Sequence, residues 1–184
     1  SSASTGSGTT SHPSVRWAKN YGGTQDEKLT SLVVNLAGES YIAGRWDGPT
    51  NDSLGTMVAG HCAGGKHAFV AKLTTGGTPV WADCFGDDAI IEAIDLDEMS
   101  GDLVVVGSFG GQIDGWGPQP FTAAQRDGFV ARYAEPMGAA ERSFLVPLSW
   151  SLDDDATGVV ALKENIYVTG TFEGTATSID LAST

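Results

Sequence analysis

The chain has 184 residues, of which 23 are acidic and 10 basic, so its formal net charge is −13 at pH 7. A surface this acidic repels nucleic acid and anionic membranes, and the sequence therefore predicts neither as a partner. No run approaches the roughly 18 consecutive apolar residues that a membrane-spanning helix requires.

The first element is a tract of small polar residues over 1–14, rich in Ser, Thr and Gly. This composition offers almost no apolar surface to bury, so we expect a flexible leader. Two origins stay open for it. It is either a tether to a surface or a neighbouring domain, or an engineered or truncated start.

After the leader, one pattern occurs three times. Segments 41–44, 104–107 and 167–170 each consist of three residues, mostly apolar, followed by a glycine, and these glycines are 63 residues apart in both intervals. The segment 67–73 returns 60 residues later as 127–133. Self-similarity at such a period indicates one structural unit that is arrayed along the chain.

A further echo sets the boundaries that we expect. The Trp-Ala dipeptide at Trp17 returns 64 residues later at Trp81. The sequence therefore predicts a first repeat over 15–77, a second over 78–138 and a partial third over 139–184.

Each repeat contains short apolar runs bounded by turn residues. In the first repeat these runs are 17–21, 29–35, 40–46 and 68–73, and they favour β-branched and aromatic side chains. No segment shows sustained helical periodicity with caps, so we expect no long helix. Four strands in each unit predict an all-β, β-propeller-like array of four-stranded antiparallel blades. We expect these residues in the core: Val33, Val34, Phe69, Val70, Val104, Val105, Phe129, Val130, Val159 and Val168.

The repeated residues also resemble a known family. They are, in the first unit, Trp17, 21–23, 41–44 and 68–73; in the second, Trp81, 85–86, 104–107 and 128–133; and in the third, Phe144 in place of the tryptophan, 156–160, 167–170 and Phe172. This pattern resembles the SBBP-type repeat of bacterial surface and secreted β-propellers, over roughly residues 15–184. The resemblance implies a fold and says little about activity. Family members close a ring of several blades, and this chain has about two and two-thirds, so we expect either a piece of a longer protein or an assembly of several copies.

The two cysteines, Cys62 and Cys84, are additions to the repeated pattern. A disulfide between them closes a short loop around one strand and indicates an oxidising compartment such as the periplasm or the cell exterior. Two inert thiols are the alternative.

Two tryptophans beside aspartates are the candidate ligand-binding residues. Trp46 and Asp47 precede one Gly-Pro loop, and Asp114 and Trp116 lie in another. An exposed tryptophan beside an aspartate can stack on a sugar ring. The alternative is that each tryptophan anchors a long loop by packing.

Two groups of carboxylates are candidate calcium ligands. Asp95 and Asp97 lie in an acidic stretch, and Asp153, Asp154 and Asp155 are consecutive, so their like charges repel unless a cation or solvent screens them. Solvated turn carboxylates are the alternative in both places. Calcium is the one cofactor that the sequence suggests.

For function, the sequence favours a non-catalytic, extracellular or cell-surface module that binds a protein or glycan, or that assembles with other copies. Arrayed units present extended loop surfaces, and no nucleophile motif occurs. The alternative is part of a secreted hydrolase or lyase that acts on polysaccharide, since paired acids are brought together in space and not in sequence.

Overall fold

The computed structural model describes residues 15–21, 25–47, 54, 65–134, 141–150, 152–163 and 165–173. As predicted, the regular structure in this part of the chain is all β, and every sheet is antiparallel. The strands are β1 (Lys28–Val34), β2 (Ser40–Asp47), β3 (Lys66–Leu73), β4 (Pro79–Phe85), β5 (Ile90–Leu96), β6 (Leu103–Phe109), β7 (Gln112–Ile113), β8 (Phe121–Thr122), β9 (Asp127–Ala134), β10 (Glu141–Leu148), β11 (Asp154–Leu162) and β12 (Asn165–Phe172). None of the described residues forms a helix long and apolar enough to cross a membrane.

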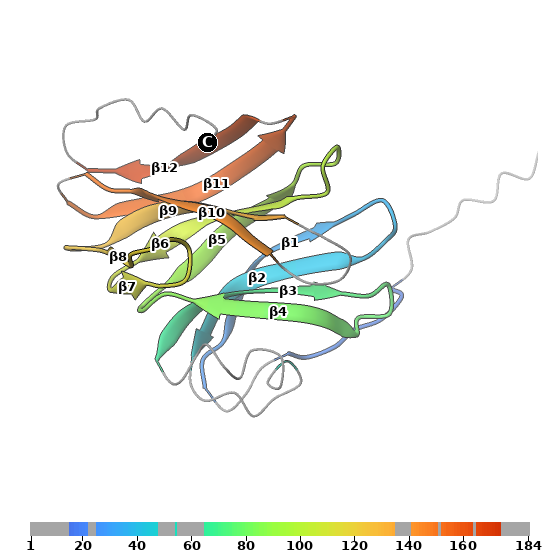
Figure 1. The fold of residues 1–184 in the computed structure, drawn as a ribbon. Helices are drawn as coiled ribbons and strands as arrows, with labels where there is room; N and C mark the ends of the chain where they lie inside the picture. The colour runs from blue at the N-terminus through green and yellow to red at the C-terminus, as the bar shows by residue number, and fades with distance from the viewer. Residues whose placement is uncertain are drawn as a thin grey trace, which may run out of the picture.

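The strands form three successive sheets and one small hairpin (Figure 1). Sheet 1 has the order β1-β2-β3-β4, sheet 2 the order β5-β6-β9-β10, and sheet 3 pairs β11 with β12. The β7–β8 hairpin is inserted between β6 and β9. Tight turns join the first two strands of sheets 1 and 2, and both use a glycine with positive φ, Gly38 at 82° and Gly101 at 79°.

The sheets stack face to face, and β5 is the strand that contacts both neighbours. It packs against β1, β2 and β3 of sheet 1 and against β11 of sheet 3. One apolar cluster fills the space between sheets 1 and 2, with Tyr41, Val70, Ile94 and Phe129 among its members. A second lies between sheets 2 and 3, and a third covers the other face of sheet 1.

The three glycines at the 63-residue spacing occupy the same place in each sheet. Each lies on the second strand, opposite a β-bulge in the first strand. A Cβ atom on Gly44, Gly107 or Gly170 would lie 1.9, 1.9 or 2.0 Å from a backbone carbonyl oxygen across the sheet. The close approach of two backbones therefore explains why glycine recurs here.

The sheets are offset by one strand from the predicted repeat boundaries. Trp81 lies on β4, which closes sheet 1, whereas the sequence placed it at the start of the second repeat. Phe144 likewise lies on β10, which closes sheet 2. Residues 17–21, predicted to be a strand, form none; Trp17 and Tyr21 pack instead against the apolar cluster on sheet 1.

Most of the predicted core is confirmed. Phe69, Val70, Val104, Val105, Phe129 and Val130 are buried, and Val33, Val159 and Val168 are partly buried. The prediction is wrong for Val34, which is 53% exposed. Its side chain lies on the face of β1 that no other described sheet covers.

Candidate functional site

The face of sheet 1 that points away from sheet 2 exposes apolar side chains of β1. We call Leu29, Leu32 and Val34 the outer face of sheet 1. The strand register makes Ile94 of β5 equivalent to Leu32, because each is the second residue after the bulge. Leu32 is 60% exposed, whereas Ile94 is 7% exposed because sheet 1 covers it. The outer face thus has the composition of an inter-sheet contact.

The face of sheet 3 that points away from sheet 2 also exposes apolar side chains. We call Val160, Leu162 and Tyr167 the outer face of sheet 3. Tyr167 is 58% exposed, while its equivalents in sheets 1 and 2, Tyr41 and Val104, are 1% and 2% exposed. At the two ends of the stack, positions on β1 and on sheet 3 whose equivalents are buried between sheets are therefore open among the described residues. On β2 and β3 the same face of sheet 1 is covered by the apolar cluster that includes Trp17 and Tyr21.

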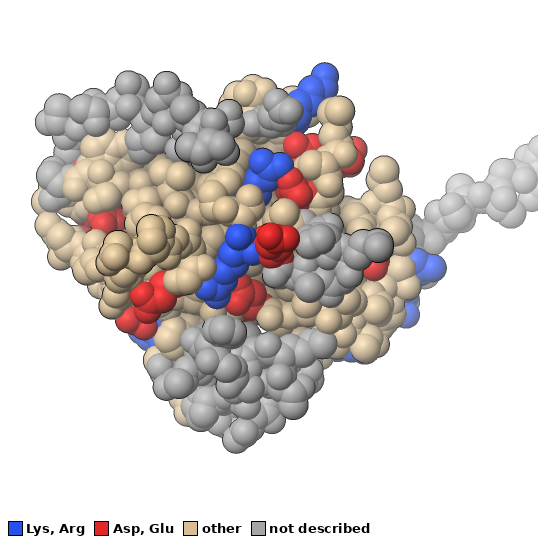
Figure 2. Space-filling model, viewed as in Figure 1, with Lys and Arg blue, Asp and Glu red and all other residues tan. Residues whose placement is uncertain are grey.

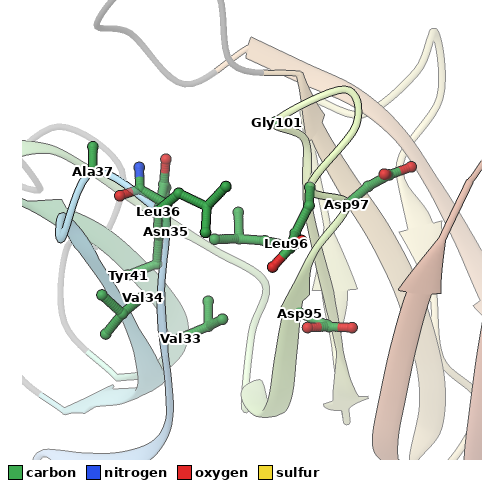
Figure 3. A pocket seen from close by; sticks show the side chains of 11 residues that line it. Val33, Val34, Asn35, Leu36, Ala37, Tyr41, Asp95, Leu96, Asp97 and Gly101 are labelled. Carbon is green, nitrogen blue, oxygen red and sulfur yellow. The ribbon is translucent and has the colours of Figure 1, made fainter.

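A cavity of about 230 Å³ lies between the turns of sheets 1 and 2. Figure 3 shows Leu36 and Leu96 approaching this space from opposite sides, one from the β1–β2 turn and one from β5. Asp95 and Asp97 also line it, and the Asp97 carboxylate is directed away from Leu36 (Figure 3). The cavity therefore has both apolar and acidic residues in its lining.

The candidate calcium ligands Asp95 and Asp97 accept hydrogen bonds from backbone amides. Asp95 Oδ2 accepts a hydrogen bond of 2.8 Å from the Ala161 amide, which ties β5 to β11. Asp97 Oδ1 accepts one of 3.0 Å from the Met99 amide within the β5–β6 turn. The two carboxylates therefore bind the backbone of two different segments, β11 and the β5–β6 turn.

The three consecutive aspartates, 153–155, also accept hydrogen bonds from different donor groups. Asp153 accepts from the Arg126 amide, and Asp155 pairs with the Arg126 guanidinium at 3.0 Å. Asp154 is fully buried and accepts from the backbone amides of Trp150 and Glu173. Among the residues that the structure describes, no group of three or more His, Cys, Asp or Glu side chains is placed to hold a metal ion.

One carboxyl beside this cluster has a shifted pKa. Burial raises the pKa of Asp127 at the start of β9, a hydrogen bond with Ser149 opposes the shift, and the charges of Asp154 and Asp153 add to it. The native protein therefore holds the proton of this group more tightly than an exposed aspartate does.

A buried polar network joins sheets 1 and 2. Arg142 of β10 makes two hydrogen bonds of 2.8 Å to the Asp83 carboxylate of β4, and the Tyr133 hydroxyl donates a third of 2.8 Å. Burial and the negative charge of Asp83 raise the pKa of Tyr133 well above its ordinary value. Burial lowers the pKa of Arg142, but the hydrogen bonds and negative charge of Asp83 outweigh this, so that the pKa of Arg142 is raised. The ion pair and these hydrogen bonds tie β4 of sheet 1 to β9 and β10 of sheet 2.

The predicted ligand-binding residues Asp114 and Trp116 belong to this junction. The Trp116 ring lies 5.2 Å from the Arg142 guanidinium and packs edge to face on Tyr133, and the Asp114 carbonyl accepts a 3.1 Å hydrogen bond from Arg142. Asp114 borders a neighbouring cavity of about 240 Å³, which His67 and Arg142 also line. Trp116 thus anchors the loop between β7 and β8 by packing.

The other predicted pair is divided between core and surface. Trp46 is 1% exposed and packs edge to face on Phe69 at 5.6 Å, so its ring presents no face to a sugar. Asp47 is half-buried at the end of β2. The structure does not bring these two residues together with Asp114 and Trp116 in one described cavity.

Sequence analysis missed Asp83, Tyr133 and Arg142. Asp83 lies 50 residues before Tyr133 and 59 before Arg142, and no motif connects the three. Pairing of opposite charges is visible on one face of the molecule. Figure 2 shows basic side chains beside acidic ones there, although the net charge of the chain is strongly negative. Of the two cysteines, Cys84 is buried on β4, while Cys62 lies outside the described residues, so their disulfide stays a prediction.

No protein-family model matches the chain, and no curated protein matches it. The resemblance to SBBP-type repeats stays a hypothesis that rests on the repeated residues.

Proposed function

We propose that the chain is a non-catalytic module of β-propeller type, whose sheets are blades and which acts through the outer faces of sheets 1 and 3. The observation that carries this proposal is the exposure of Leu32 and Tyr167 at positions whose equivalents are buried between sheets. Clustered apolar side chains of this kind mark contact surfaces in proteins.

The partner that fits these faces best is a further sheet of the same kind, supplied by another copy of the chain. The outer face of sheet 3 then meets the outer face of sheet 1 of the next copy, as the inner faces of sheets 1 and 2 meet within the molecule. Such a head-to-tail contact uses two different surfaces, so it builds rings or filaments.

A protein partner suits the apolar faces better than a glycan does. Sugar recognition needs an exposed aromatic face beside polar groups, and both candidate tryptophans are packed against other residues. Among the residues that the structure describes, no contact favours the hydrolase or lyase alternative.

The proposed setting is the cell surface or the extracellular space. It is supported by the resemblance to secreted repeats and by the predicted disulfide between Cys62 and Cys84. Assembly of repeated units at a surface is consistent with the resemblance and with the predicted disulfide.

A photo-crosslinking amino acid placed at Tyr167 of the purified chain tests the proposal. We expect intermolecular crosslinks from this position, and mass spectrometry should map them to β1 of another copy. The matched control is Met99, which is 76% exposed at a turn outside both outer faces. Equal crosslinking from the two positions would refute contact through the outer face of sheet 3.

A further inference from the structure

The edge of β12 differs from the corresponding edges in the other two sheets. In sheets 1 and 2 the second strand pairs on its far side with a third strand, β3 or β9. In the described part of sheet 3, β12 pairs with β11 alone, and Figure 1 shows it at the margin of the stack. Exposed edges of this kind are templates for strand pairing.

Both complete sheets pair the third strand in the same register. The bulge-facing glycine of the second strand lies opposite a phenylalanine, Gly44 opposite Phe69 and Gly107 opposite Phe129. Three residues further along, a basic side chain follows, with Lys72 opposite Tyr41. The third strands thus share a phenylalanine, two small apolar residues and a lysine or arginine.

The second strand holds that phenylalanine in a defined way. The glycine leaves room, and an aromatic ring two residues after it packs edge to face on the phenylalanine, Trp46 on Phe69 at 5.6 Å and Phe109 on Phe129 at 6.4 Å. In sheet 1 the Lys72 ammonium also lies 5.4 Å from the Tyr41 ring.

Sheet 3 carries the same features. Gly170 and Phe172 correspond to the glycine and the aromatic ring, and Tyr167 corresponds to Tyr41. Gly170 and Tyr167 are exposed, and Phe172 is 36% exposed and packs on one side against the Trp150 ring at 4.7 Å, whereas Trp46 and Phe109 are 1% and 0% exposed. The residues that hold a third strand in sheets 1 and 2 are thus present in sheet 3 and more exposed, among the described residues.

We propose that the β12 edge binds an antiparallel strand of a partner chain, with a phenylalanine opposite Gly170 and a lysine or arginine opposite Tyr167. The inference rests on the proposed function, since it treats sheet 3 as a unit of the same array, and it identifies the bound element. Main-chain hydrogen bonds supply affinity, and the aromatic and basic side chains fix the register.

A fluorescein-labelled peptide of residues 125–134, which contains β9, is the probe. We expect it to bind the purified chain in an anisotropy titration and to slow hydrogen exchange at the β12 amides. A Phe129→Ser version of the peptide should bind about ten-fold or more weakly, because it loses the aromatic contact. Tyr167→Ala in the protein should also weaken binding, while the control Met99→Ala should leave it unchanged.

Absent binding, equal affinity of the two peptides, or exchange protection located away from β12 would each overturn the inference. The test is separate from the crosslinking experiment on the outer face of sheet 3. Crosslinks to β1 without peptide binding support assembly and exclude strand acceptance; peptide binding without those crosslinks supports strand acceptance and excludes head-to-tail assembly.

Discussion

Substitution of Gly107 by alanine tests why glycine recurs at each bulge. The new Cβ would lie 1.9 Å from the Ile90 carbonyl oxygen and 2.9 Å from the Ile91 Cα. A non-bonded carbon prefers separations near 3.5 Å, so the two strands must move apart in the middle of a buried sheet. Overpacking of a tight site costs about 3 kcal/mol. For a chain of this size that lowers Tm by roughly 6–12 °C.

Two other glycines serve as graded controls in the same thermal unfolding assay. A Cβ on Gly76 would meet only the Thr74 hydroxyl at 3.9 Å, so Gly76→Ala should change stability by less than about 1 kcal/mol. Gly101 has open space but a φ of 79°, so Gly101→Ala should cost about 1–2 kcal/mol of backbone strain. If Gly107→Ala unfolds at the same temperature as Gly76→Ala, the reasoning about backbone approach is refuted.

Three further predictions concern side chains. Arg142→Ala should lower the free energy of unfolding in urea by about 3 kcal/mol, because it leaves the Asp83 carboxylate buried without its cation. The control Arg126→Ala breaks more exposed pairs and should lower it by less than about 1 kcal/mol. Equal losses of unfolding free energy in the two variants would contradict the argument. Asp127 has a raised pKa, so its ionised form is destabilising above that pKa and protonation relieves the cost as the pH falls. Asp127→Asn should therefore be more stable relative to the wild type at pH 7 than near the ordinary carboxyl pKa, and a Tm difference that does not change with pH would contradict the shift. Trp46→Ala should cost about 3–5 kcal/mol as a core truncation, and an unchanged Tm would disprove burial of this ring.

The repeat could be predicted from the sequence, but the start of each sheet could not. A period fixes the distance between equivalent residues and leaves open which strand comes first. The β3–β4 turn decides this, because Thr74 and Thr78 close it with a 2.8 Å backbone hydrogen bond and bring Trp81 into sheet 1. The two glycines at 76 and 77 were the signal in the sequence for this turn.

The candidate site could be predicted less well, for two physical reasons. The apolar pattern of β1 matches that of β5, so Val34 reads as a core residue; its burial depends on a neighbouring sheet, which β5 has and β1 lacks among the described residues. The Arg142 network unites residues 50–59 positions apart, and only the folded topology brings them together.

Sedimentation velocity of the unmodified chain over a wide range of concentration tests the central claim most directly. The outer faces of sheets 1 and 3 predict association that grows with concentration and that is lost when Leu32→Lys or Tyr167→Lys places a charge on either face. The control Met99→Lys should associate like the wild type. A single monomeric species at every concentration would contradict assembly through these faces.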